Sequence, residues 1–294
     1  MDSPFGSLVT AMVTPFKPDS EIDYQKAERL VEILIEKGSD SLVISGTTGE
    51  SPTLSAEEKL ALFKVAVGAA KGRVKVIAST GNNWTKATVD FCREAEKTGV
   101  DGFLIVAPYY NKPPQEGLYR HFKEIAAAVG LPIMLYNIPG RTGVNMLPET
   151  TLRLAEIDNI VAIKETSGDI DQISAICAGA PEGFYVYSGD DSFLLPVLGV
   201  GGRGVVSAVG NIAGLEIKKL TEAFFARDME TAVKQHQKLM PLIKALFMTT
   251  NPIPVKAALN LAGILDVGDP RLPLIPLPED MRKNLKEVLD QYTF

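Results

Sequence analysis

A lysine at the end of an apolar run is the residue in this sequence best placed to do chemistry. Lys164 follows Ile160-Val-Ala-Ile163, a stretch typical of a buried β-strand. Burying an ammonium group is costly, so apolar surroundings favour the neutral, nucleophilic amine. Such an amine can condense with a ketone to form a Schiff base. The alternative is a strand-end lysine that reaches solvent or pairs with Glu165, and position alone does not decide between the two.

Hydroxyl side chains stand at or just after the ends of other apolar runs. Tyr136 and Tyr110 are two of them, and a phenol beside a threonine hydroxyl can pass protons along a short chain. The alternative is that each ring packs in the core and its hydroxyl bonds locally. Thr47 and Thr48 lie in the glycine-flanked turn Gly46–Glu50. Hydroxyl and N–H groups in such a turn can hold a carboxylate, although an ordinary turn with a capping threonine is the alternative.

Two further segments could contact anionic groups. Arg141 follows Pro139-Gly140, and its planar guanidinium suits a bidentate contact with a carboxylate, although surface arginines are common. Gly189 ends another apolar run and is followed by two aspartates. The glycine-rich segment 199–204 is similar to a phosphate-binding loop, but it lacks the Lys-Ser/Thr ending and precedes a strand. A tight turn into that strand explains it better.

These candidate residues follow a regular alternation of strands and helices. Eight short, mostly continuous apolar runs are typical of parallel strands covered on both faces. The runs are Leu8–Thr14, Ser41–Ser45, Val74–Thr80, Gly102–Pro108, Leu131–Asn137, Ile160–Glu165, Phe184–Gly189 and Gly204–Val209. This number favours a closed (β/α)₈ TIM barrel over an open sheet. Because barrel enzymes place catalytic groups at the carboxyl ends of their strands, we expect the candidates to meet there.

Helices are expected between the strands and after the last of them. Apolar residues recur at helical spacing in Asp23–Lys37, and Ser55 followed by Glu58 is a capping-box pattern. No strand pattern follows Gly210. The later helices are expected over Leu215–Arg227, Glu230–Met248, Pro254–Leu261 and Glu279–Gln291. We therefore predict a catalytic barrel over residues 1–226 and a C-terminal helical domain over residues 227–294.

The composition is that of a soluble globular protein. Of the 294 residues 46% are hydrophobic and 22% charged, and the formal net charge of −6 disfavours nucleic acid and anionic membranes as partners. Cys92 and Cys177 alone cannot form a disulfide framework, and His121 and His236 are isolated, so we expect no metal site. The first residues lack a signal-peptide pattern and no run approaches the length of a membrane span, so we expect a cytoplasmic protein.

Taken in order, these motifs resemble the dihydrodipicolinate synthase family, within the N-acetylneuraminate lyase superfamily. The matching segments are Gly6–Pro15, Gly46–Leu54, Ala107–Pro113, Tyr136–Gly143, Ile163–Glu165, Ser188–Asp191 and Asn251–Lys256. The resemblance extends over nearly the whole chain, and the joint occurrence of these segments in this order is highly specific.

The resemblance implies a condensation of pyruvate with L-aspartate 4-semialdehyde on the way to diaminopimelate and lysine. Lys164 matches the Schiff-base lysine of the family, and Tyr136 matches its proton donor and acceptor. Thr47 and Tyr110 match the other members of a proton relay, in which the latter reaches in from a neighbouring subunit. The family implies no metal or organic cofactor.

The resemblance also implies substrate-binding positions and an assembly. Thr48 and the backbone around Val206 match positions that bind pyruvate, and Gly189 is grouped with these substrate-binding residues. Arg141 matches the arginine that holds the carboxylate of the semialdehyde. The expected assembly is a homotetramer built from two tight dimers, and a lone dimer is the alternative.

Three other functions are alternatives to this condensation. A Schiff-base aldolase acting on sialic acid or a 2-keto-3-deoxy sugar acid would share the lysine and the tyrosine, but such members typically lack an arginine in the Gly140–Thr142 segment. A non-catalytic barrel is disfavoured because every candidate catalytic position is intact. A nucleotide-dependent oxidoreductase is disfavoured because the dinucleotide fingerprint is missing.

The chain departs from the branch of the family that free lysine inhibits. Polar residues are retained at three positions of the inhibitor site, namely Ser51, Asn83 and Tyr109. However, Ala87 stands where a glutamate would bind the ammonium groups of the ligand, and Ala56 and Lys59 replace two usual histidines. Because a positive charge near a cationic ligand is unfavourable, we expect weak or no inhibition by lysine.

Overall fold

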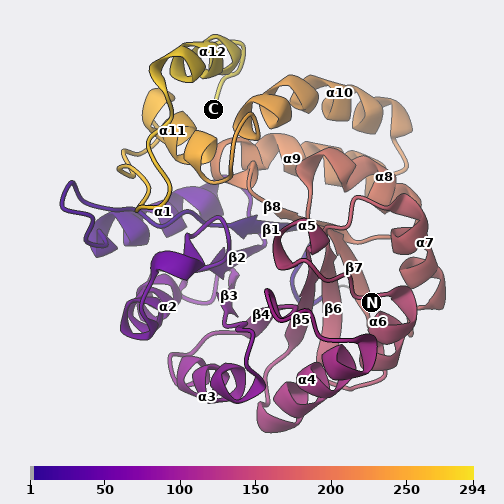
Figure 1. The fold of residues 1–294 in the computed structure, drawn as a ribbon. Coiled ribbons are helices and arrows are strands. Elements are labelled where there is room, and N and C mark those ends of the chain that lie inside the picture. Colours follow the sequence, from indigo (N-terminus) through magenta and orange to yellow (C-terminus); the bar gives the residue numbers. More distant parts are fainter. Residues whose placement is uncertain (1–2) are drawn as a thin grey trace.

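The chain folds into a closed barrel of eight parallel strands, surrounded by helices (Figure 1). The computed structural model describes residues 3–294. The strands are β1 (Leu8–Ala11), β2 (Ser41–Ile44), β3 (Lys75–Ser79), β4 (Gly102–Val106), β5 (Ile133–Asn137), β6 (Ile160–Glu165), β7 (Tyr185–Ser188) and β8 (Gly204–Ser207). Each strand pairs with the next along the chain, and β8 pairs with β1. The predicted TIM barrel is confirmed, although most strands end before the apolar runs do.

Helices cover the outside of the barrel, except for the short α5 (Pro139–Thr142), which lies over the carboxyl ends of the strands (Figure 1). The covering helices are α1 (Tyr24–Glu36), α2 (Ala56–Ala70), α3 (Thr85–Glu96), α4 (Gln115–Ala128), α6 (Pro148–Ala155), α7 (Ile170–Gly179), α8 (Leu194–Gly199) and α9 (Gly210–Phe225). The predicted capping box is present, since the Ser55 hydroxyl accepts the N–H of Glu58 and the Glu58 carboxylate accepts the N–H of Ser55. The helix α9 begins at Gly210 rather than at the predicted Leu215, because a first buried turn precedes a kink at Ala213.

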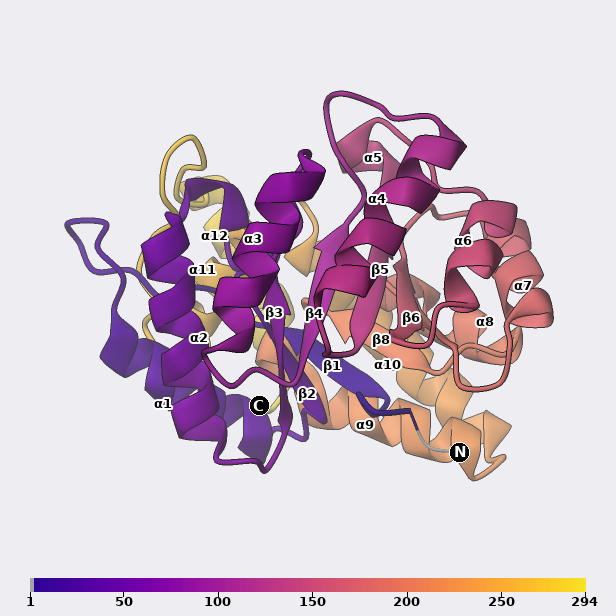
Figure 2. The same ribbon diagram turned by 90° about the horizontal axis from the view of Figure 1, so that it is seen from below.

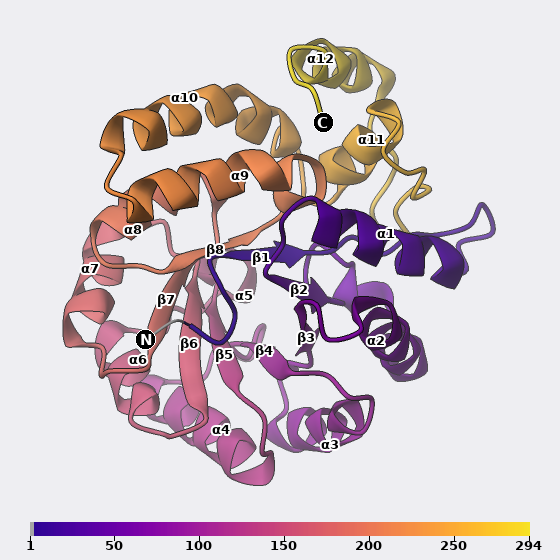
Figure 3. The same ribbon diagram turned by 180° about the vertical axis from the view of Figure 1, so that it is seen from behind.

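Apolar side chains form two cores on the two faces of the sheet. One fills the barrel interior, and a larger one lies between the strands and the helices. The N-terminal segment crosses the end of the barrel where the strands begin (Figure 3). There Phe5 is buried in the interior core, and the Tyr187 hydroxyl donates to the Gly6 carbonyl at 2.7 Å. This segment covers the amino end of the barrel, with Phe5 filling its interior.

Three helices follow the barrel: α10 (Met229–Leu246), α11 (Ile253–Leu261) and α12 (Glu279–Leu289). In Figure 1, α10 runs along the outside of α9, while α11 and α12 lie beyond α9 on the side of α1. No helix within residues 3–294 is long and apolar enough to cross a membrane.

Candidate active site

The candidate lysine lies inside the barrel, next to the candidate tyrosine. Lys164 on β6 is in register with Tyr136 on β5 and with Tyr187 on β7. Because side chains alternate between the two faces of a strand, all three point into the barrel. Lys164 is 6% exposed, and its Nζ lies 4.2 Å from the centroid of the Tyr136 ring. The amine is therefore buried against an aromatic face rather than extended into solvent.

Glu165, the ion-pair partner considered in the alternative role of Lys164, points the other way. Its carboxylate accepts hydrogen bonds from Asn137 Nδ2 at 3.0 Å and from the Ser167 N–H at 2.7 Å. The Gln172 amide donates a further bond at 3.2 Å. Burial raises the pKa of Glu165, and these donors act against that rise. The structure therefore shows neither of the two alternative roles of Lys164, a lysine that reaches solvent or a Lys164–Glu165 ion pair.

A cavity of about 240 Å³ opens at the carboxyl ends of the strands, above this lysine. It brings together most of the predicted site residues, namely Lys164, Tyr136, Thr47, Thr48, Arg141, Gly189 and Val206. They come from segments spread over β2, β5, β6, β7 and β8 and their following loops. Thr48 and Val206 are buried, whereas Arg141 stands exposed at the mouth. The arrangement suits a small keto acid at the bottom and an anionic group at the rim.

Tyr110 is the one predicted site residue that does not line the cavity. It is 89% exposed and adopts a left-handed backbone conformation with a φ of 73°. Its loop between β4 and α4 stands out beside α5 (Figure 2). In the described single chain Tyr136 and Thr47 line the cavity, whereas Tyr110 stands outside it. A complete relay would therefore need a further change, such as the approach of a second subunit.

Gly189 leaves room beside Lys164. A Cβ atom at this position would lie 1.8 Å from Thr166 Oγ1 and 3.0 Å from Lys164 Cε. Contacts closer than 3.0 Å to a Cβ are essentially never seen. Gly189 is not among the glycines with a positive φ, so it is the crowding by Thr166 and Lys164, and not the turn after β7, that disfavours a side chain here.

Eight residues that line the cavity were not among the predicted site residues, and three of them carry polar groups placed to meet a ligand. Thr166 Oγ1 and Asn251 Oδ1 are buried without a hydrogen-bond partner, so both can accept a bond from a ligand. Asp190 also faces the cavity, and burial raises its pKa while the nearby Lys164 lowers it. All three lie within or next to motifs quoted from the sequence, but only the folded chain turns them toward Lys164.

A second buried lysine provides a contrast with Lys164. Lys256 Nζ donates to Glu50 Oε1 at 2.9 Å, to the Thr14 carbonyl at 3.1 Å and to the Asp269 carbonyl at 3.0 Å. All three N–H groups of its ammonium are therefore used, and no lone pair is available for attack. Among the described residues only these two lysines are buried, and Lys164 alone faces the cavity.

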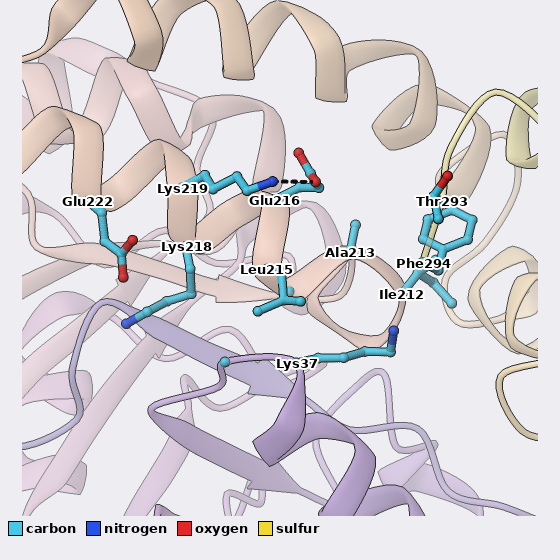
Figure 4. A pocket seen from close by; sticks show the side chains of 12 residues that line it. Lys37, Ile212, Ala213, Leu215, Glu216, Lys218, Lys219, Glu222, Thr293 and Phe294 are labelled. Carbon is cyan, nitrogen blue, oxygen red and sulfur yellow. Dashed lines mark hydrogen bonds and ion pairs between the residues drawn. The ribbon is translucent and has the colours of Figure 1, made fainter.

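A larger cavity of about 350 Å³ lies away from these residues, on the outside of the barrel between the end of α1 and α9 (Figure 4). Two of its lysines are engaged in ion pairs, Lys218 with Asp40 at 2.8 Å and Lys219 with Glu216 at 3.1 Å. Its size does not make it the reaction site, because none of the candidate catalytic residues lines it.

The fold and the first cavity together define a barrel lyase with a buried lysine at the end of its sixth strand. The sequence pattern of the Dihydrodipicolinate synthetase family matches residues 4–292, and the chain belongs to this family. A 4-hydroxy-tetrahydrodipicolinate synthase of Bacillus subtilis is 54% identical, with 98% of this chain and 99% of that protein covered.

Solved structures agree with this membership. A dihydrodipicolinate synthase from Bacillus anthracis superposes with a TM-score of 0.97 at 46% identity, and the match covers all of both chains. A dihydrodipicolinate synthase described as a monomeric variant superposes with a TM-score of 0.95 at 45% identity, covering 98% of this chain and 97% of that one.

Proposed function

We propose that this chain condenses pyruvate with L-aspartate 4-semialdehyde through a Schiff base on Lys164, as a 4-hydroxy-tetrahydrodipicolinate synthase of the diaminopimelate pathway. The observation that carries the proposal is the buried Lys164 amine, which lies against the Tyr136 ring in a cavity open at the carboxyl ends of the strands. Membership of the family supports the choice of substrates.

In the proposed reaction the Lys164 amine attacks the ketone carbon of pyruvate and water leaves. The iminium withdraws electrons, so a methyl proton is lost and an enamine forms. The enamine carbon attacks the aldehyde of the second substrate, and the new alkoxide takes up a proton. The amine of the semialdehyde then attacks the imine carbon and displaces Lys164, which closes the ring. Tyr136 lies beside the amine and is assigned the proton transfers.

The remaining polar groups are assigned to substrate binding. We place the pyruvate carboxylate at Thr48 and the backbone around Val206, in the buried part of the cavity, with Gly189 leaving space beside it. Arg141 at the mouth is assigned to the carboxylate of the semialdehyde. Thr47 and Tyr110 are assigned to the proton relay with Tyr136.

The exposure of Tyr110 supports a site shared between subunits. A tyrosine that is 89% exposed and held in a left-handed conformation cannot serve the cavity of its own chain as it stands. We therefore propose that it enters the cavity of a neighbouring subunit in a homotetramer of two tight dimers. We also propose that the protein acts in the cytoplasm.

Borohydride trapping tests the proposed function. Incubation with pyruvate and borohydride should add one reduced pyruvyl group, and digestion followed by mass spectrometry should locate it on Lys164. The Lys164→Ala variant should fold and take up no label. A label on another lysine would refute the assignment, and cleavage of sialic acid faster than condensation of the semialdehyde would favour a sugar-acid lyase instead.

A further inference from the structure

We infer that the segment after α10 positions the loop that binds pyruvate, and that Lys256 and Glu50 are the positioning residues that join the two. The inference rests on the proposed function, because it assigns the loop after β2 to pyruvate. That loop carries Thr47 and Thr48, and residues of the C-terminal segment, among them Lys256 and Arg271, bind to it.

The joint between the two segments is a buried ion pair. Lys256 on α11 and Glu50 in the loop have side chains that are 1% and 0% exposed, and their charged atoms lie 2.9 Å apart. The other two hydrogen bonds of the ammonium go to the Thr14 and Asp269 carbonyls, and its charge lies 4.2 Å from the centroid of the Phe16 ring. A buried charge that loses its partner is strongly unfavourable, so neither member of this pair can move alone.

Glu50 is also held by the segment that follows α11. Its second carboxylate oxygen accepts the backbone N–H of Arg271 at 2.9 Å. The Arg271 guanidinium in turn donates to the Thr53 carbonyl at 2.8 Å and to both carboxylate oxygens of Glu58 at 2.6 and 3.0 Å. Glu50 itself has a φ of 59°, a left-handed conformation that a non-glycine residue keeps only when its surroundings hold it there.

The contacts of this segment extend to a residue assigned to substrate binding. Asn251, just before α11, donates from Nδ2 to Thr48 Oγ1 at 2.9 Å. The Thr14 hydroxyl donates to the Gly49 carbonyl at 2.7 Å, in the same loop. Thr14 also accepts from Lys256 through its own carbonyl. The lysine therefore orders the loop on one side through Glu50 and on the other through Thr14.

The chemical consequence concerns pyruvate more than the semialdehyde. Thr48 lies in the buried part of the cavity, whereas Arg141 stands on α5 at the mouth. Loosening the loop after β2 should mainly displace the groups that hold pyruvate. Arg141 should be disturbed less, because it is joined to this segment by a long hydrogen bond, 3.4 Å from its guanidinium to the Asn251 carbonyl. A displacement of about 1 Å in positioning groups can reduce a rate on the order of a hundredfold.

The test is the Lys256→Met variant of the full chain, which keeps the apolar stem and removes the charge. We expect the KM for pyruvate to rise by about ten- to a hundredfold. The KM for the semialdehyde should rise by less than the KM for pyruvate, because the bond between Arg141 and the Asn251 carbonyl is long and Arg141 itself stands on α5. Thr14→Val, which removes only the hydroxyl bond to Gly49, should raise the KM for pyruvate by about fivefold, as expected for one hydrogen bond.

Lys218→Met is the matched control. Lys218 forms an ion pair with Asp40, and the Asp40 carboxylate accepts the N–H groups of Ser7 and Leu8. Unlike the Lys256–Glu50 pair, this pair lies at the amino ends of the strands. The Lys218→Met variant should have a lower melting temperature and unchanged KM values for pyruvate and for the semialdehyde.

The outcomes separate the inference from the proposed function. If Lys256→Met folds and its KM for pyruvate is that of the unmodified protein, or rises no more than in Lys218→Met, the inference is wrong. If Lys256→Met does not fold, Thr14→Val decides in the same way. If the unmodified protein does not trap pyruvate at Lys164, it is the proposed function that fails.

Discussion

Replacing Gly189 with alanine should lower the reactivity of Lys164 although the lysine itself is unchanged. The new Cβ would lie 1.8 Å from Thr166 Oγ1, 2.9 Å from Thr166 Cβ and 3.0 Å from Lys164 Cε. The hydroxyl must therefore move by more than an ångström. It can do so only by turning Thr166 to another rotamer or by moving the ends of β6 and β7, which pair beside it.

The expected magnitude follows from these distances. Overpacking by one methyl group in a tight site costs about 1–3 kcal/mol of stability. The larger effect should fall on the chemistry, because the group next to the clash is the reacting amine itself. A displacement of Lys164 by about 1 Å should lower kcat/KM on the order of a hundredfold.

The assay is the rate of borohydride trapping at a fixed pyruvate concentration, together with the melting temperature. Thr166→Ala removes the oxygen that makes the shortest contact, so the double variant Gly189→Ala/Thr166→Ala should recover part of the lost trapping rate. Gly199→Ala is the matched control, because a Cβ there meets no atom within 4 Å. An unchanged trapping rate in Gly189→Ala, or no recovery in the double variant, would contradict the steric argument.

Four further expectations follow from the site and its surroundings. Arg141→Ala should raise the KM for the semialdehyde by roughly tenfold to a hundredfold, as expected for a lost charged hydrogen-bond partner, while pyruvate trapping survives; an unchanged KM would remove the arginine from the site. Mixing inactive Tyr110→Phe with inactive Lys164→Ala should regenerate activity in hybrid dimers, and hybrids without activity would argue against a shared site. Lysine titrated into the millimolar range at saturating pyruvate should inhibit weakly or not at all, whereas clear inhibition below millimolar lysine would show that the retained polar residues suffice. Burial lowers the pKa of His121 to about 4. As the pH falls from about 6.5 to about 4, the imidazole takes up a proton in the unfolded chain but not in the folded chain. The free energy of unfolding should therefore decrease by up to about 3 kcal/mol over this range. His121→Gln should weaken this acid sensitivity in melting curves, and an unchanged pH dependence would refute the cause.

The strand order and the place of the chemistry could be predicted from the sequence because their signals are local. Apolar runs separated by amphipathic stretches specify βα units, and eight of them favour a closed barrel. Lys164 and Tyr136 lie at the ends of such runs, and the turn with Thr47 and Thr48 follows one. Their common position at the carboxyl ends of strands therefore follows from the rules of the fold. The expected first residue of α9 was wrong, since a kink within one helix leaves no local signal in the pattern.

Only the tertiary structure decided which way neighbouring side chains point and which distant residues meet. Strand alternation places Lys164 and Glu165 on opposite faces, but which of them enters the barrel depends on the register of β6 between β5 and β7. That register turns the Glu165 carboxylate outward to Asn137. The contacts of Asn251 with Thr48 and of Lys256 with Glu50 join segments that are far apart in the chain. Such contacts depend on barrel closure and on the packing of the last helices, which local periodicity does not encode.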